Sequence, residues 1–261
     1  KTLDYSKVYF FESDITTLEK ERYSFDDYIL AGDIQPFFDM FNLYEKRMLE
    51  RMEYVDTILA QGFDFTEYDS AQINRNNSKW VSSLEEMNEL WEGRVKNDAL
   101  NLSLAGRDEE EIKTNLKKRY DNFSRALYQY NSEDVFQLAM DAYTSSIDPH
   151  TNYLSPATSE NFKIDMSLSL EGIGARLMIE DGYTKVVEVI PGGPAFKSKE
   201  IFVDDRIIAV AQGEDGEFVD VIGWRITDVV KLIRGPKETT VRLQILKAKD
   251  GVVAKPEEIT L

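Results

Sequence analysis

The chain has 261 residues, enough for one large domain or two ordinary ones, and its 42% hydrophobic and 30% charged residues are typical of a folded globular protein. Its net charge of −17 disfavours a nucleic-acid partner, because nucleic-acid binding requires a basic surface. The absence of cysteine excludes disulfides, thiolate metal sites and cysteine nucleophiles.

The N-terminal segment carries no apolar core of the kind that a signal peptide needs, and no apolar run approaches the roughly 18–20 residues of a membrane span. We therefore expect a mature protein or fragment from which any targeting signal is missing. Residues 1–160 contain 31 acidic and 17 basic side chains, a net charge of −14. We interpret this excess as the solvated faces of helices.

The spacing of apolar residues predicts that residues 1–160 are helical. The longest helix is expected to begin near Asp33, with Pro36 in its first turn, and to end at Gly62. A second begins with a capping box formed by Ser83 and Glu86. Its expected buried residues are Leu84, Met87, Trp91 and Val95.

Two further helices follow in the same region. One begins after Gly106 with the acidic run 108–111 at its positive end, and Ser132 is expected to cap the other. The acidic run lacks the ligand spacing of a calcium loop, so we interpret it as a helix start. The apolar stripes are Ile112, Leu116, Tyr120, Phe123, Leu127 and Tyr130, then Val135, Leu138, Ala139, Ala142 and Tyr143.

The pattern changes after Asp148, where residues 148–160 are typical of a boundary loop. Short β-type runs then follow, with Asp181-Gly182 as a strong hairpin signal between the first two. One helix interrupts them, with Thr227 as its cap and Arg234-Gly235-Pro236 as its stop. The β-type runs are 175–179, 185–190, 207–210, 240–246 and 258–261. Five or six short strands with one or two helices predict a small, partly open barrel.

The segment 167–177 is the most informative for function. Gly172 and Gly174 flank Ile173 immediately before the first strand, and glycine lets successive N–H groups turn together to form an anion-binding nest. A peptide carboxylate held there receives charge-assisted hydrogen bonds, while the strand pairs with the rest of the peptide by β-augmentation. Taken alone, this Gly-x-Gly is also compatible with an ordinary tight turn.

The order of these parts resembles a PDZ domain of the bacterial protease-associated kind. The stretch Gly172–Ala175 matches that family's Gly-Leu-Gly-Phe carboxylate loop, and the helix matches the pocket-facing helix of the family. Two departures stand out: Asp204 occupies the position of a common glycine, and Ala175 replaces phenylalanine, which should enlarge the pocket. The resemblance implies carboxylate binding by Gly172, Ile173, Gly174 and Ala175, and a peptide groove formed by Arg176, Leu177, Val229, Val230 and Ile233.

The resemblance extends to the whole chain. Residues 147–156, the segment 166–175, Val8-Tyr9-Phe10 with Ser13-Asp14-Ile15, and 219–225 are similar to the tail-specific, or C-terminal processing, proteases. That family's layout implies a helical region, a PDZ domain and then a catalytic domain with a serine–lysine dyad. We expect the dyad to lie outside this chain, which would then be inactive alone. Ser167 and Ser169 lack a partner base, and the single histidine, His150, lacks a triad.

The sequence thus predicts an all-α N-terminal domain, residues 1–160, followed by a PDZ domain of α/β type, residues 162–261. By resemblance, they form the substrate-recognition part of a periplasmic serine endopeptidase that binds free, apolar C-terminal tails of unfolded or tagged proteins. We expect no cofactor, no metal and no nucleic-acid partner. Two alternatives remain open: a non-enzymatic PDZ adaptor, and a dimerisation role for the helical domain.

Overall fold

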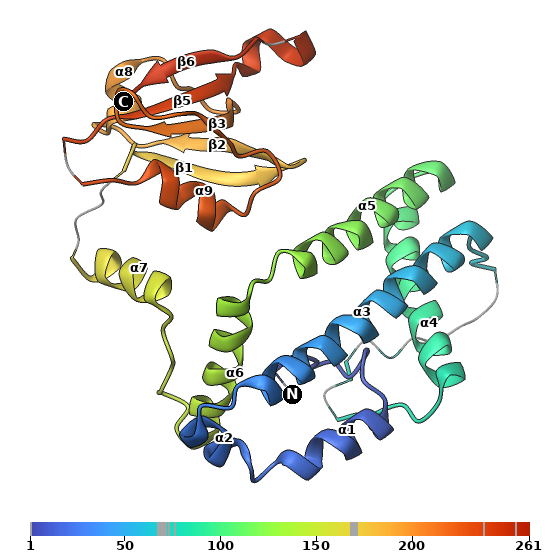
Figure 1. Cartoon of the computed structure of the whole chain (residues 1–261). Coiled ribbons are helices and arrows are strands. Elements are labelled where there is room, and N and C mark those ends of the chain that lie inside the picture. The colour runs from blue at the N-terminus through green and yellow to red at the C-terminus, as the bar shows by residue number, and fades with distance from the viewer. Residues whose placement is uncertain are drawn as a thin grey trace. The chain divides into compact units, whose positions relative to one another are not determined.

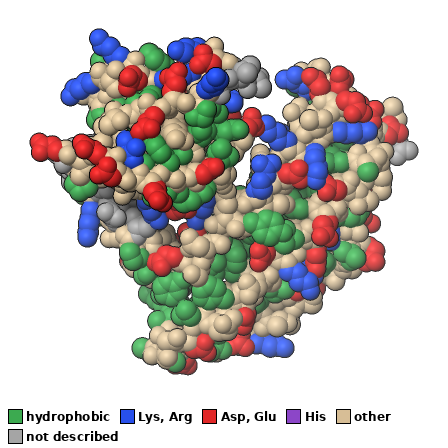
Figure 2. Space-filling view, turned by 45° about the horizontal axis from the view of Figure 1, so that its top comes forward, with side chains coloured by type: hydrophobic (Ala, Val, Ile, Leu, Met, Phe, Trp, Pro, Cys, Tyr) green, Lys and Arg blue, Asp and Glu red, His purple; other side chains and the backbone are tan. Residues whose placement is uncertain are grey.

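The computed structural model describes residues 2–66, 72, 74, 75, 77–167, 172–236, 238–253 and 255–261. The chain divides into two compact units, Lys1–Ser155 and Pro156–Leu261, each of which is described by itself (Figure 1). Within these described ranges, no helix is long and apolar enough to cross a membrane. Acidic, basic and hydrophobic side chains are interspersed on the face shown in Figure 2.

The first unit is helical. Its elements are α1 (Glu12–Leu18), a short 3₁₀ turn (Glu19–Glu21), α2 (Phe25–Ala31), α3 (Gln35–Gln61), α4 (Leu84–Leu104), α5 (Glu109–Tyr128) and α6 (Ser132–Ile147). The long helix α3 packs against α4, α5 and α6. Val55, Trp91 and Leu116 are at most 1% exposed in the largest core cluster. The Trp91 indole N–H donates to the Val8 carbonyl over 2.7 Å, which fixes the N-terminal segment to this core.

The structure confirms some of the predicted helix starts and ends and contradicts others. Gly62 ends α3 as predicted, and the Ser83 hydroxyl accepts from the Glu86 N–H at the start of α4. The Glu86 carboxylate, however, accepts from the N–H of Ser82 and not from that of Ser83, so only one half of the predicted capping box forms. Leu84 was predicted to be buried and is 51% exposed, because it lies on the first turn, ahead of the buried stripe.

Other sequence predictions of local structure were wrong. Asn131, not Ser132, caps α6, because its side chain accepts from the Asp134 N–H. Residues expected to form a boundary loop instead begin helix α7 (Pro156–Ser167). Phe123 and Tyr130, placed on the buried stripe, are 42% and 46% exposed. The short helices α1 and α2, of 7 residues each, were missed because two turns hardly establish a periodicity.

The second unit contains an antiparallel sheet of six strands in the order β1-β2-β3-β5-β6, with β4 paired to β3. The elements are β1 (Ala175–Glu180), β2 (Tyr183–Val189), α8 (Pro194–Ser198), β3 (Arg206–Gln212), β4 (Val219–Asp220), α9 (Ile226–Ile233), β5 (Val241–Leu246), a 3₁₀ turn (Ala248–Val253) and β6 (Glu257–Thr260). Val186, Ile207 and Leu243 are fully buried in the core of this unit. The fold is therefore a small antiparallel sheet domain with helices that follows a helical region, as predicted.

Two turns of this unit explain why the chain follows this path. Asp181 and Gly182 both have positive φ, 54° and 83°, as a two-residue hairpin turn requires, and they join β1 to β2 as predicted. Asp204 has φ 71°, a left-handed conformation that favours glycine and that aspartate tolerates better than most residues. The departure at Asp204 thus keeps the backbone geometry that glycine would adopt.

The helix α9 begins earlier than predicted. Its N-cap is Arg225 and its first residue is Ile226, so Thr227 lies inside the helix and does not cap it. The Arg225 carbonyl accepts from the N–H groups of Asp228 and Val229, which fixes the first turn. The helix ends at Ile233, as the Arg-Gly-Pro stop signal indicates.

Candidate peptide-binding site

The loop before β1 has its carbonyl groups tied to the protein. The Ile173 carbonyl accepts from the Ala195 N–H and the Gly174 carbonyl from the Ile190 N–H, each over 2.8 Å. No backbone carbonyl in the described part of the chain accepts from the N–H groups of Gly172, Ile173 or Gly174. Because buried or half-buried N–H groups need acceptors, this arrangement leaves a set of donors for a ligand.

A close approach between two glycines fixes the shape of this loop. Gly174 has φ 70°, and a Cβ added to it would lie 2.8 Å from the Cα of Gly193. A Cβ on Gly193 would likewise lie 2.9 Å from the Cα of Gly174. Both positions therefore require glycine, and the contact holds the segment 190–195 against the loop.

The strand β1 and the helix α9, between which the peptide groove was predicted, pack beside each other (Figure 1). At one end Arg234, just after α9, lies beside Gly172, with its Cγ 3.8 Å from the position of an added Cβ. At the other end the Gly223 N–H, just before α9, donates to the Gly182 carbonyl over 2.7 Å. The helix and the strand therefore run antiparallel along the groove. No described strand pairs with the outer edge of β1, so an extended peptide can pair there.

The groove residues named from the sequence occupy different environments. Ala175 and Leu177 pack, half-buried, against the core, while Arg176 points outward and forms a 3.3 Å ion pair with Glu188. Val229 is fully buried in the core, so it supports the helix from beneath. Val230 is half-buried on α9.

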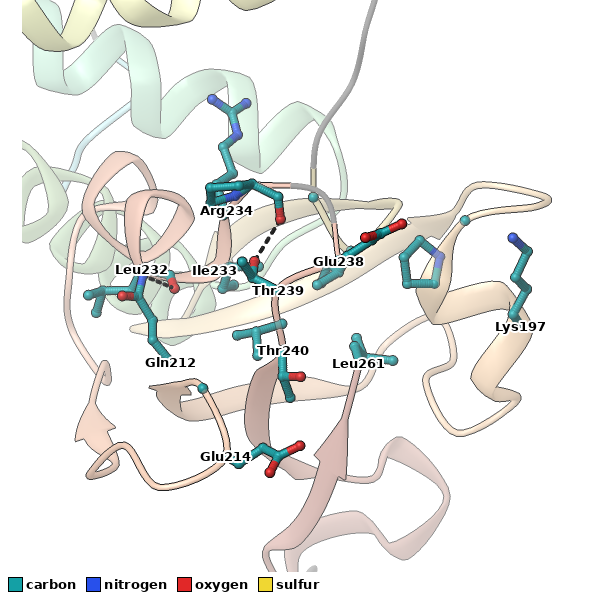
Figure 3. A pocket seen from close by; sticks show the side chains of 18 of the residues that line it. Lys197, Gln212, Glu214, Leu232, Ile233, Arg234, Glu238, Thr239, Thr240 and Leu261 are labelled. Carbon is teal, nitrogen blue, oxygen red and sulfur yellow. Dashed lines mark hydrogen bonds between the residues drawn. The ribbon is translucent and has the colours of Figure 1, made fainter.

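A cavity of about 950 Å³ lies beside the loop and the end of α9. Of the predicted residues, it brings together Gly172, Ile173 and Ile233; the other six do not line it. Figure 3 shows further lining residues that sequence reasoning missed, which come from separate loops and strands. Among them are Lys197, Gln212, Arg234, Thr239, Thr240 and Leu261.

Two hydrogen bonds fix the polar wall of this cavity. The Gln212 Nε2 donates to the Leu232 carbonyl over 3.1 Å, and the Thr239 hydroxyl donates to the Pro236 carbonyl over 2.7 Å (Figure 3). In the same view the guanidinium of Arg234 points away from Thr240 and Leu261. The cavity adjoins the loop and is distinct from the strip along β1, none of whose residues line it.

The remaining candidates do not form a site in the described residues. Leu168–Glu171, including Ser169, lie outside them, and Ser167 ends α7. His150 lies on an exposed loop, where its ring contacts the Asp148 carboxylate at 3.1 Å. Asp108 caps α5 through a capping box with Glu111, as expected of a helix start. Over the described ranges, no group of three or more potential ligands could hold a metal ion.

Comparison with known protein families identifies the class of protein to which this chain belongs. Residues 161–246 match the PDZ domain family. Residues 1–157 match the family described as the tail specific protease N-terminal domain, which covers more than half of the chain. The chain therefore belongs to the tail-specific protease family.

Individual relatives agree with this assignment. The tail-specific protease of Haemophilus influenzae is 39% identical over 96% of this chain and 36% of its own length. The carboxy-terminal processing protease of Bacillus subtilis is 33% identical over 52% of this chain and 28% of its own length. A solved structure, the PDZ domain of the carboxy-terminal protease from Vibrio cholerae in complex with peptide, is 48% identical over 35% of this chain and 90% of its own, with a TM-score of 0.33. The chain thus spans about a third of the curated relatives' length.

Proposed function

We propose that this chain is the substrate-recognition part of a periplasmic, C-terminal processing serine endopeptidase, and that it holds substrates by their free, apolar carboxyl ends. The observation that carries the proposal is the loop Gly172–Gly174, whose N–H groups have no described backbone acceptor, at the start of an edge strand. The relatives, which are named as C-terminal processing proteases, support it.

The proposed binding step follows from this geometry. The terminal carboxylate accepts from the loop N–H groups in bonds worth roughly 1.5–3 kcal/mol each, and the preceding residues pair with β1. The last side chain lies near Ile173 and Ile233, both 5% exposed, which line the cavity. Cleavage would require a serine–lysine dyad, which we place outside this chain.

Matched peptides with a free or amidated carboxyl end test this proposal. Amidation removes the charge that the loop N–H groups await, so it should weaken binding by about ten-fold or more in calorimetry or fluorescence anisotropy. Ile233→Glu should have a similar effect, because it places a carboxylate beside the peptide's own. Glu110→Gln, on the first turn of α5, is the matched control and should leave affinity unchanged. Equal affinity for the acid and the amide would overturn the proposal.

Because the proposed function places the serine–lysine dyad outside this chain, we predict that the chain alone does not hydrolyse peptide bonds. Incubation with an unfolded, casein-like protein should release no fragments, because no serine of the chain matches the catalytic motifs of the family. Turnover that survived repurification and that a serine-directed reagent blocked would contradict this prediction.

A further inference from the structure

The segment 219–225 is similar to the tail-specific proteases, but the proposed binding step does not involve it. Its centre is anchored: Val221 is fully buried, and its N–H donates to the Ile208 carbonyl over 2.9 Å. The Trp224 N–H donates back to the Val221 carbonyl over 3.2 Å and closes a turn, in which Gly223 has φ 79°. The turn is therefore a fixed support for the two side chains that it presents, Ile222 and Trp224.

The turn lies at the end of the groove opposite to the carboxylate loop. Gly223 is hydrogen-bonded to Gly182 at the tip of the β1–β2 hairpin, and Arg225 caps α9 directly after the turn. Since Gly172 marks the other end, a peptide that leaves the loop along β1 must travel toward this turn.

Three exposed apolar side chains come from the elements that meet here. Trp224 is 39% exposed, Ile222 is 45% exposed and Ile179, near the end of β1, is 37% exposed. Ile179 lies on the same face of the strand as Ala175 and Leu177, because alternate residues of a strand share a face. Two exposed aspartates belong to the same elements: Asp181 precedes Gly182 in the hairpin turn, and the Asp220 carboxylate accepts from the Ile222 N–H over 2.8 Å.

The register of a bound peptide places one of its side chains at this position. With its carboxylate at the start of β1, the peptide must run antiparallel to the strand. Its last residue is then opposite Ala175, and each earlier residue lies opposite the next residue of β1. The fifth residue from the carboxyl end faces Ile179, roughly 13 Å from the last one at about 3.3 Å per residue. Directly opposed residues share a face, so its side chain points to the α9 side.

We propose that Ile179, Ile222 and Trp224 form a second specificity site, which takes an apolar or aromatic side chain at the fifth position from the free carboxyl end of a substrate tail. This inference rests on the proposed function, because it needs the carboxylate to fix the register. The site adds affinity by covering apolar surface, and Asp181 and Asp220 discriminate against an acidic side chain at the same position.

The test uses seven-residue tails with the same last three residues, in acid and amide forms. The fifth residue from the end is leucine, serine or aspartate. With the unmodified chain, the leucine tail should bind about five-fold more tightly than the serine tail, and the aspartate tail should bind most weakly. Trp224→Ala should reduce the leucine–serine difference to less than about two-fold.

Two controls show what a failure would mean. A four-residue tail ends before the proposed site, so Trp224→Ala should leave its affinity unchanged, which also verifies that the variant is folded. Phe202→Ala removes another exposed aromatic ring, 57% exposed, and should preserve the leucine–serine difference. If the acid tails bind better than the amides but the fifth residue has no effect, the second site is wrong while the proposed function stands. If acid and amide tails bind equally, the proposed function fails first.

Discussion

At the scale of single residues, the contact between Gly174 and Gly193 leaves no room for a side chain at position 174, in the loop that we propose binds the carboxylate. Gly182 provides a matched comparison, because it also has a positive φ, 83°, but nothing lies within 4 Å of an added Cβ. Gly182→Ala should therefore cost only the strain of a left-handed residue, about 1–2 kcal/mol. Gly174→Ala should cost at least about 1 kcal/mol more, because its Cβ collides with the Gly193 backbone.

Urea denaturation of the two variants measures this difference, and tail binding measures its consequence. Gly174→Ala should also lose the preference for acid over amide tails, whereas Gly182→Ala should keep it. Equal destabilisation by both substitutions would show that the loop and the segment 190–195 can separate at no cost.

A second residue-scale prediction concerns Thr184 on β2. Thr184 is fully buried, and its hydroxyl oxygen has no hydrogen-bond partner among the described residues. Burying a hydroxyl without a partner costs free energy, and valine has nearly the same shape. Thr184→Val should therefore raise the free energy of unfolding by about 1 kcal/mol, as measured by thermal and urea denaturation.

The reverse substitution is the control for Thr184. Val186 on the same strand is also fully buried, so Val186→Thr introduces an unpartnered hydroxyl and should destabilise the chain by about 1–3 kcal/mol. A lower stability of Thr184→Val would mean that its hydroxyl has an acceptor in solution.

At the scale of elements, helices with a long, regular apolar pattern could be predicted from the sequence. Elements that are short or lack such a pattern could not. The 27 residues of α3 give many turns of regular apolar spacing, so its existence and its end at Gly62 were predictable. The helix α7 has no comparable stripe, and the two-residue β4 is too short for any pattern.

The same distinction applies to the candidate site: a part formed by neighbouring residues was predictable, and a part formed by residues far apart in the sequence was not. The loop at Gly172–Gly174 was predictable because glycine spacing is local. The cavity was not, because Gly172 and Thr240 meet only after the sheet has folded. Val229 was assigned to the groove by resemblance to the family, and the structure places its side chain, fully buried, in the core of the unit.

The packing of α3 against the N-terminal segment predicts sensitivity to alkaline pH. Burial, together with Tyr9 and Asp4 nearby, raises the pKa of Tyr44 on α3 well above its ordinary value. A phenol with a raised pKa stabilises the fold fully below the unfolded value of about 10, and this stability is lost as the pH rises further. The free energy of unfolding of the helical unit should thus decrease between about pH 9.5 and pH 11.5.

Tyr44→Phe isolates this effect. It keeps the ring that contacts Tyr9 and Phe41, at centroid distances of 5.5 and 6.0 Å, but cannot ionise. Urea denaturation at pH 8 and pH 11 should show a smaller loss of stability for this variant than for the unmodified chain. Tyr128→Phe, at a residue 67% exposed, should change the loss little. Equal losses in all three proteins would show that Tyr44 ionises without cost in the folded state.

At the scale of the whole molecule, the net charge of −17 should influence which tails arrive at the groove. The helical unit, Lys1–Ser155, holds most of this charge, since its 30 acidic and 17 basic side chains sum to −13. Charges of the same sign slow the encounter of a tail with the protein. This repulsion acts over a screening length that depends on the salt concentration, about 30 Å at 0.01 M and about 10 Å at 0.1 M. They should affect the association rate more than the contacts of the bound state, because in the proposed binding mode the loop and β1 hold the tail.

Two tails with the same last seven residues, preceded either by two lysines or by two glutamates, test this effect. Stopped-flow anisotropy at about 10 mM salt should give an association rate several-fold to about ten-fold lower for the glutamate tail. The dissociation rates should be nearly equal, because the added residues lie beyond the end of β1 and outside the groove. At about 0.5 M salt the association rates should converge to within about two-fold. A tail with two serines should fall between the charged tails and depend least on salt. If the difference instead lay in the dissociation rate and persisted at high salt, the charged residues would be making direct contacts, and long-range repulsion by the acidic molecule would not explain the preference.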